Sequence, residues 1–141
     1  MKRALSVGIT LSVIVFASLA ATGQVKKGET RLLLTKQLMG GLVGPNCKGL
    51  GDGLKEAPAD DKAWAALATK AALLNEASYV LMADGRCPDG VWAGAATALR
   101  EGSAAVYEKI EAKDAEGAQA AFKTMTQACG TCHKAHKKKS S

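Results

Sequence analysis

Four stretches in which apolar residues return every three or four positions dominate the sequence. This spacing gathers them on one face of an α-helix, and no stretch shows the strict alternation typical of a β-strand. The four stretches cover residues 32–42, 64–81, 92–110 and 118–136. Asp60 or Asp61 is expected to begin the second helix, and Pro88 with Asp89 the third, because these residues favour helix N-termini. The sequence therefore predicts an all-α fold.

Turn-forming residues separate the four predicted helices. Residues 49–60 are expected to form a loop, whereas residues 84–86 and 113–114 are expected to form short connections. Glycines and a proline are expected to weaken or kink the end of the first helix: Gly40, Gly41, Gly44 and Pro45. Short connections place successive helices side by side in opposite directions. We therefore expect an antiparallel up-down-up-down four-helix bundle.

The N-terminus has the pattern of a secretory signal. Lys2 and Arg3 precede an apolar run that ends at Phe16, and small residues follow it. The run is too short to span a bilayer comfortably. We expect residues 1–23 to be a cleaved signal peptide and residues 24–141 to form one domain in the periplasm, with no stable membrane insertion.

The charge of the chain argues against nucleic acid as a partner. Removing the two cations of the signal leaves 17 of the 19 basic residues against 13 acidic ones, which is only mildly basic. Aromatic residues do not alternate with the lysines, as they would at a typical nucleic-acid interface. The C-terminal lysines instead suggest an acidic partner protein or a solubilising tail: Lys134, Lys137, Lys138 and Lys139.

The composition predicts a thin protein core. Aromatic residues make up only 4% of the chain, and the helical stripes are rich in alanine. Small side chains leave space between helices unless the helices approach very closely. A bound group in the core is one way to fill that space.

Cys129-Gly130-Thr131-Cys132-His133 has the C-x-x-C-H form of covalent haem attachment. On a helix, Cys129 and Cys132 lie nearly on one side, where each thiol can add to a vinyl group of haem. His133 follows, and its imidazole can bind the iron. The sequence predicts one covalently attached haem c, with His133 as the proximal axial ligand.

Three other roles for the cysteines fit the sequence less well. A redox-active dithiol normally begins a helix after a strand, whereas this pair ends a helix in a chain without strands. A zinc site would have to recruit Cys47 or Cys87, which are isolated in the sequence. A disulfide between Cys129 and Cys132 would give His133 no role.

With the motif near the C-terminus, on the last of four helices behind a signal peptide, the chain resembles the class II c-type cytochromes, the cytochrome c′ family. Leu38-Met39 in the first helix, and Pro88, Asp89 and Trp92 at the start of the third, extend the resemblance. It implies a four-helix bundle that carries a haem and transfers single electrons, often as a homodimer.

The ligand on the second face of the iron is less constrained. His136 and Met125 lie on the same helix as His133, so they cannot reach that face; His136 is expected at the surface or at the haem edge. Met82 is expected in the core or at a helix end. The resemblance places Met39 where low-spin family members supply a methionine ligand. Met39 as plain core packing is the alternative, and it would leave five-coordinate iron open to small gases.

Two further features stay open. The family commonly pairs an arginine with a haem propionate near the distal ligand, but only Arg31 or Lys36 is available here. Export favours a disulfide between Cys47 and Cys87, whereas a straight bundle would place these cysteines at opposite ends.

These observations predict an exported monohaem cytochrome that transfers single electrons to redox partner proteins. The alternative is a cytochrome c′-like protein that binds nitric oxide or carbon monoxide. We expect no enzymatic turnover, because no catalytic constellation of carboxylates, serine or a second histidine is evident.

Overall fold

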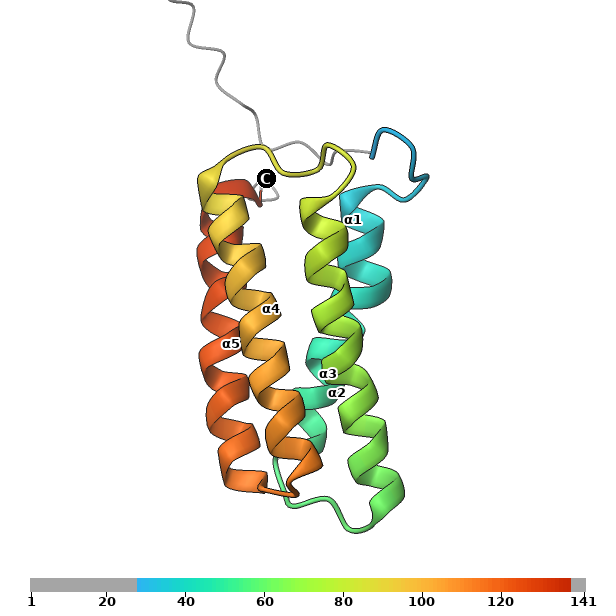
Figure 1. The fold of residues 1–141 in the computed structure, drawn as a ribbon, viewed down its shortest axis with the longest axis vertical. Helices are drawn as coiled ribbons and strands as arrows, with labels where there is room; N and C mark the ends of the chain where they lie inside the picture. The colour runs from blue at the N-terminus through green and yellow to red at the C-terminus, as the bar shows by residue number, and fades with distance from the viewer. Residues whose placement is uncertain (1–27, 138–141) are drawn as a thin grey trace, which may run out of the picture.

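The computed structural model describes residues 28–137, and this part of the chain is an all-helical bundle (Figure 1). Three helices of 22 residues each make up most of it: α3 (Asp61–Met82), α4 (Gly90–Glu111) and α5 (Ala115–His136). A shorter helical run precedes them and consists of α1 (Thr35–Leu38), η1 (Met39–Val43) and α2 (Gly44–Gly53). The predicted all-α class is confirmed for the described residues.

Each long helix begins at an aspartate that accepts a hydrogen bond from a backbone N–H three residues later. Asp60 caps α3 in this way at 2.7 Å, Asp89 caps α4 at 2.9 Å, and Asp114 caps α5 at 2.8 Å. These contacts satisfy N–H groups that have no partner within the helix. The predicted starts of the second and third helices are therefore confirmed.

The first helical run differs from the prediction at both ends. Leu32, expected on the apolar stripe, lies before the helix and is 81% exposed. At the other end, the helix does not end at the glycines and Pro45 but continues as α2 to Gly53. The predicted loop was therefore wrong over residues 49–53, and non-helical chain joins α2 to α3 only over residues 54–60.

A wider turn lets the chain pass Pro45 without ending the helix. Residues Met39–Val43 form a π-helical turn, in which the N–H of Gly44 donates to the carbonyl of Met39, five residues earlier. Pro45 then stands in the first turn of α2. A proline is tolerated there because its missing N–H is not needed.

The predicted apolar stripes form the core. Leu67, Ala71, Leu74 and Leu81 of α3 are buried, as the spacing predicted. The stripe of α4 is buried in full: Trp92, Ala95, Leu99, Val106 and Ile110. On α5, Ala118 and Met125 are buried, whereas Phe122, Cys129, Cys132 and His136 are only partly covered.

The helices pack mainly through their neighbours in sequence. The closest associations are α4 with α5, α3 with α4, and α2 with α3. The α3–α4 connection lies at one end of the bundle, and the α2–α3 and α4–α5 connections lie at the other (Figure 1). The C-terminal end of α5 therefore shares an end of the molecule with α1.

The segment before α1 is held by the connection between α3 and α4. The carboxylate of Asp84 accepts hydrogen bonds from the backbone N–H groups of Thr30 and Arg31 at 2.8 and 2.9 Å. Arg86, only 1% exposed, donates to the carbonyl of Leu33 at 2.7 Å and lies 3.5 Å from Asp84. Asp84 and Gly85 take positive φ angles of 61° and 71°, which close this turn tightly.

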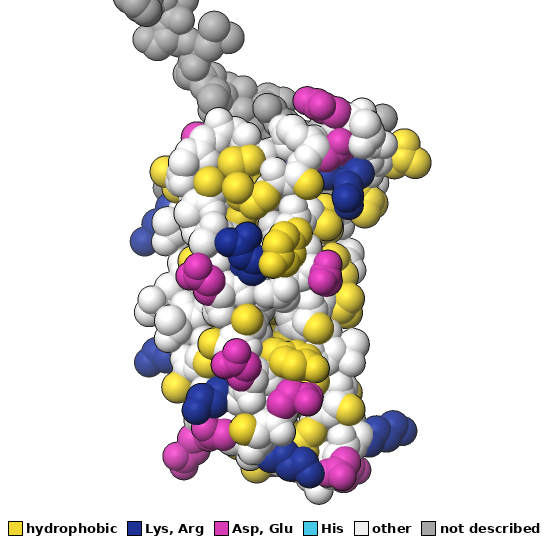
Figure 2. Space-filling view, in the orientation of Figure 1, with side chains coloured by type: hydrophobic (Ala, Val, Ile, Leu, Met, Phe, Trp, Pro, Cys, Tyr) yellow, Lys and Arg dark blue, Asp and Glu magenta, His cyan; other side chains and the backbone are white. Residues whose placement is uncertain are grey.

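Among the described residues, no helix is long and apolar enough to cross a membrane. The predicted signal peptide, residues 1–23, and Lys138 and Lys139 lie outside the described part of the chain. On the face of the bundle shown in Figure 2, basic and acidic side chains are intermixed and form no patch of one sign.

Candidate haem-attachment site

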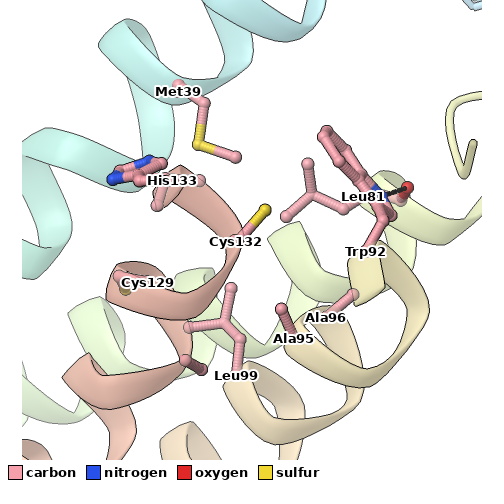
Figure 3. Close-up of a pocket in the computed structure, with 11 residues that line it drawn as sticks. Met39, Leu81, Trp92, Ala95, Ala96, Leu99, Cys129, Cys132 and His133 are labelled. Atoms are coloured by element: carbon pink, nitrogen blue, oxygen red, sulfur yellow. Dashed lines mark hydrogen bonds between the residues drawn. The ribbon is translucent and has the colours of Figure 1, made fainter. Parts of the chain in front are cut away.

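The four sequence-predicted site residues line one pocket. Cys129, Cys132 and His133 lie in the last turns of α5, and Met39 is the first residue of the π-helical turn. These two segments lie more than eighty residues apart in the chain. The fold therefore brings the C-x-x-C-H motif and the predicted distal methionine together at one end of the bundle (Figure 3).

The rest of the pocket is apolar and, apart from Trp92, is built from small or branched side chains. The enclosed cavity has a volume of about 50 Å³, which is well below the roughly 300–1,000 Å³ of typical small-molecule sites. The remaining lining comes from η1, α3, α4 and α5: Val43, Leu81, Trp92, Ala95, Ala96, Leu99 and Ala128. The alanines that suggested a thin core thus border this opening.

Trp92 fixes the wall formed by α3 and α4. Its indole N–H donates to the carbonyl of Leu81 at 2.8 Å, and the ring is only 8% exposed. Figure 3 shows Trp92 and Leu81 on the side of the pocket opposite His133. The hydrogen bond ties the end of α3 to the start of α4 and positions both side chains.

The two cysteines of the motif have different surroundings. In Figure 3 the sulfur of Cys132 points into the space between Met39 and Leu81. Burial, followed by the charge of Cys129 and of Asp89, raises the pKa of the Cys132 thiol. Cys132 is therefore the less acidic thiol of the pair.

Cys129 contacts a third cysteine, Cys47 of α2. A hydrogen bond between the two thiols lowers the pKa of Cys129 to about 7, with a smaller contribution from its own backbone, against the opposing effect of burial. The same hydrogen bond, followed by burial, raises the pKa of Cys47. Cys129 is therefore the thiol of the motif that reaches its thiolate form near neutral pH.

His133 is open to solvent, and the two other candidate methionines lie outside the pocket. His133 is exposed at the pocket. Met82 ends α3 and is 36% exposed, whereas Met125 is buried beside a different groove between α4 and α5. Neither methionine lines the pocket that holds Met39.

His136 is not the surface residue that the sequence suggested. Its side chain is 12% exposed, its ring packs edge-on against Trp92 with centroids 5.4 Å apart, and its Nε2 lies 3.4 Å from Asp89. His136 therefore lies where the end of α5 meets the start of α4, beside the aspartate that caps α4. The expectation that it lies at a haem edge stays a prediction.

The structure also bears on the cysteines that sequence reasoning left open. All four cysteines are free thiols, so Cys47 and Cys87 are not bridged. Cys87 contacts the carbonyl oxygen of Asp89 instead. The sequence did not predict the contact of Cys47 with Cys129, because the two residues are far apart in the chain and no local pattern pairs them.

The expected partners of a haem propionate are not part of the pocket lining. Arg31 and Lys36 are both exposed, and neither lines the pocket. The arginine that is buried at this end of the bundle, Arg86, comes from the α3–α4 connection. Nothing in the sequence pattern singled it out.

No group of three or more histidine, cysteine or acidic side chains within residues 28–137 is arranged to hold a metal ion. No protein-family model, curated protein or solved structure matches the chain.

Proposed function

We propose that this chain is an exported monohaem c-type cytochrome of the class II type that transfers single electrons. The observation that carries the proposal is the convergence of Cys129, Cys132, His133 and Met39 on one apolar pocket. The first three residues have the spacing of a haem-attachment motif. Met39 reaches the same pocket from a different helix.

The residues present fit a covalently held haem. Cys129 and Cys132 would supply two thiols for thioether bonds, His133 and Met39 would supply an imidazole and a thioether that can bind iron, and the remaining walls are apolar. When bound, haem would supply an iron that exchanges one electron between its ferrous and ferric forms. The thioether bonds of Cys129 and Cys132 would prevent its loss to the surroundings.

The chain's own residues would set the properties of the site. The apolar side chains exclude water, which limits how much the surroundings rearrange when charge changes. Met39 would favour the reduced form and raise the reduction potential, since methionine ligation has this effect in c-type cytochromes. Its position at a π-helical turn is consistent with such a role, because these turns are frequent at functional sites.

The surface near the motif supports an acidic redox partner. Lys134 and Lys137 are exposed on the last turn of α5 and just beyond it. Long-range attraction between such lysines and an acidic surface accelerates association and weakens with salt. The antiparallel up-down-up-down order belongs to the same proposal and is supported by the alternating ends of the connections (Figure 1).

The deciding experiment is expression with a signal peptide in a bacterium that has a haem-attachment system. We expect the purified chain to carry one haem that survives denaturation and to have a low-spin ferric spectrum. In Met39→Ala the haem should remain attached while the spectrum becomes high-spin. Met82→Ala is the matched control and should keep the low-spin spectrum, because Met82 does not line the pocket.

Other results would redirect the proposal. A high-spin ferric spectrum in the unmodified chain, with ready binding of carbon monoxide to the ferrous form, would favour the gas-binding alternative. A chain that leaves the export pathway with unmodified Cys129 and Cys132, alongside a control cytochrome that matures normally, would contradict haem attachment altogether.

A further inference from the structure

The contact between Cys47 and Cys129 belongs to a row of contacts between α2 and α5. Gly51 approaches the ring of Phe122 so closely that an added Cβ would lie 3.2 Å from it. Farther along, the side-chain amide of Gln119 donates to the carbonyl of Leu54. These two contacts show that α2 packs directly against α5, and the hydrogen bond between the Cys47 and Cys129 thiols lies on the same pair of helices.

We propose that Cys47 and Cys129 form an intramolecular disulfide in the haem-free protein, and that this bond withholds Cys129 from haem attachment until a reductant opens it. The disulfide itself rests on the contact between the two thiols. Its effect on attachment rests on the function proposed above, because one sulfur cannot carry both a disulfide and a thioether.

The chemistry requires an external oxidant, such as a low-molecular-weight disulfide or the disulfide of an oxidoreductase in the exporting compartment. The Cys129 thiolate attacks one sulfur of that disulfide and releases the other as a thiol. Cys47 loses its proton and attacks the mixed disulfide at Cys129, which releases the second thiol. The two cysteines lose two electrons and two protons, and the oxidant gains them.

The order of attack follows from the environment of each thiol. The pKa of Cys129 is lowered to about 7, so a large fraction is thiolate at neutral pH. Thiols whose pKa lies near the ambient pH are the most effective attackers in exchange reactions. Cys132 faces the pocket and not Cys47, so Cys129 is expected to react first.

The first test maps the bond in haem-free chain. Chain purified in the reduced state is exposed to oxidised glutathione, digested with trypsin without reduction and analysed by mass spectrometry. Cleavage after lysine and arginine places Cys47 in peptide 37–48, Cys87 in 87–100 and both motif cysteines in 124–134. We expect peptide 37–48 joined to 124–134, and free thiols to fall from four to two.

Single substitutions identify the sulfur in peptide 124–134. The link should persist in Cys132→Ser and disappear in Cys129→Ser, while Cys87→Ser should leave it unchanged. Three results would each overturn the proposal. They are a main product with a disulfide inside peptide 124–134, a disulfide that joins peptide 37–48 to peptide 87–100, and four thiols that all stay free.

The second test separates the disulfide from the proposed function. Covalent haem is measured by mass on chains exported with and without added thiol reductant. Omitting the reductant should lower haem loading more in the unmodified chain than in Cys47→Ser. Equal dependence in both would overturn the gating role. If neither chain loads haem even with reductant, the cytochrome proposal fails, whereas a mapped disulfide between Cys47 and Cys129 would still stand.

Discussion

Gly102 of α4 lies so close to Met125 of α5 that a Cβ added to Gly102 would come within 2.8 Å of the Cβ of Met125 and 3.0 Å of its Cα. The second atom belongs to the backbone and cannot move without shifting the helix. The absence of a side chain at Gly102 therefore sets how closely α4 and α5 pack. Because α5 carries the C-x-x-C-H motif, this contact also sets where the motif lies.

Replacing Gly102 with alanine should destabilise the protein. Overpacking of a tight contact costs about 1–3 kcal/mol, and that cost should exceed the gain in helix propensity of up to about 1 kcal/mol. Gly94→Ala is the control on the same helix, because nothing lies within 4 Å of its added Cβ. Urea unfolding should show that Gly102→Ala is less stable than the parent and that Gly94→Ala is at least as stable. Equal free energies of unfolding for the two variants would show that α4 and α5 move apart to accept the added methyl group at no cost.

Removing the indole N–H of Trp92 should weaken the wall of the pocket. In Trp92→Phe the carbonyl of Leu81 loses its donor, at a net cost of about 1 kcal/mol for the hydrogen bond together with some packing. Trp64→Phe makes the same chemical change at a partly buried position that does not line the pocket. Thermal unfolding of both variants checks this, and a Trp92→Phe midpoint no lower than that of Trp64→Phe would contradict it.

Asp84 should make the protein sensitive to acid. Hydrogen bonds from the backbone of Thr30, then from its side chain and from Arg31, together with the charge of Arg86, lower the pKa of Asp84. A carboxyl whose pKa is lower in the folded state stabilises the fold above its unfolded pKa of about 3.9. That contribution is lost as the pH falls through the folded pKa.

Asp84→Asn therefore should be less stable than the parent at pH 6, and its stability should change less between pH 5 and pH 2. Asparagine tolerates the positive φ at this position, so the backbone conformation is retained. Urea unfolding across this pH range measures both effects. Parallel pH profiles for the two proteins would exclude Asp84 as a source of the acid sensitivity.

Asp89 should contribute more than an ordinary helix cap. Removing a capping aspartate costs about 0.5–2 kcal/mol, and Asp60→Ala measures that loss at the start of α3. Asp89→Ala should cost more, because it also removes the partner of His136. A double-mutant cycle of Asp89→Ala with His136→Ala measures the coupling; a coupling energy of zero would show that the 3.4 Å contact contributes nothing.

The sequence predicted the long helices well because their signals are local. Asp60, Asp89 and Asp114 cap helices through bonds to residues three positions away, and the stripe of α4 is buried as its spacing indicated. That Met39 lines the same pocket as Cys129 and Cys132 agrees with the resemblance to the cytochrome c′ family, which placed a methionine of the first helix opposite the motif.

The errors arose where neighbouring turns decide the outcome. Pro45 normally ends a helix, but the π-helical turn before it puts this residue in a tolerated position, and sequence spacing does not reveal that adjustment. The contact of Cys47 with Cys129 and the burial of Arg86 depend on how helices and connections far apart in the chain meet. No local pattern encodes those positions.

The widened turn at Met39–Val43 changes the rotation of α2 about the helix axis relative to α1. An α-helix rotates about 100° per residue. Deleting one residue from this turn would therefore rotate the Cys47 thiol away from Cys129 without changing the direction in which the Met39 side chain points. A single peptide unit thus sets the angular phase between two sulfur atoms that face the same end of α5.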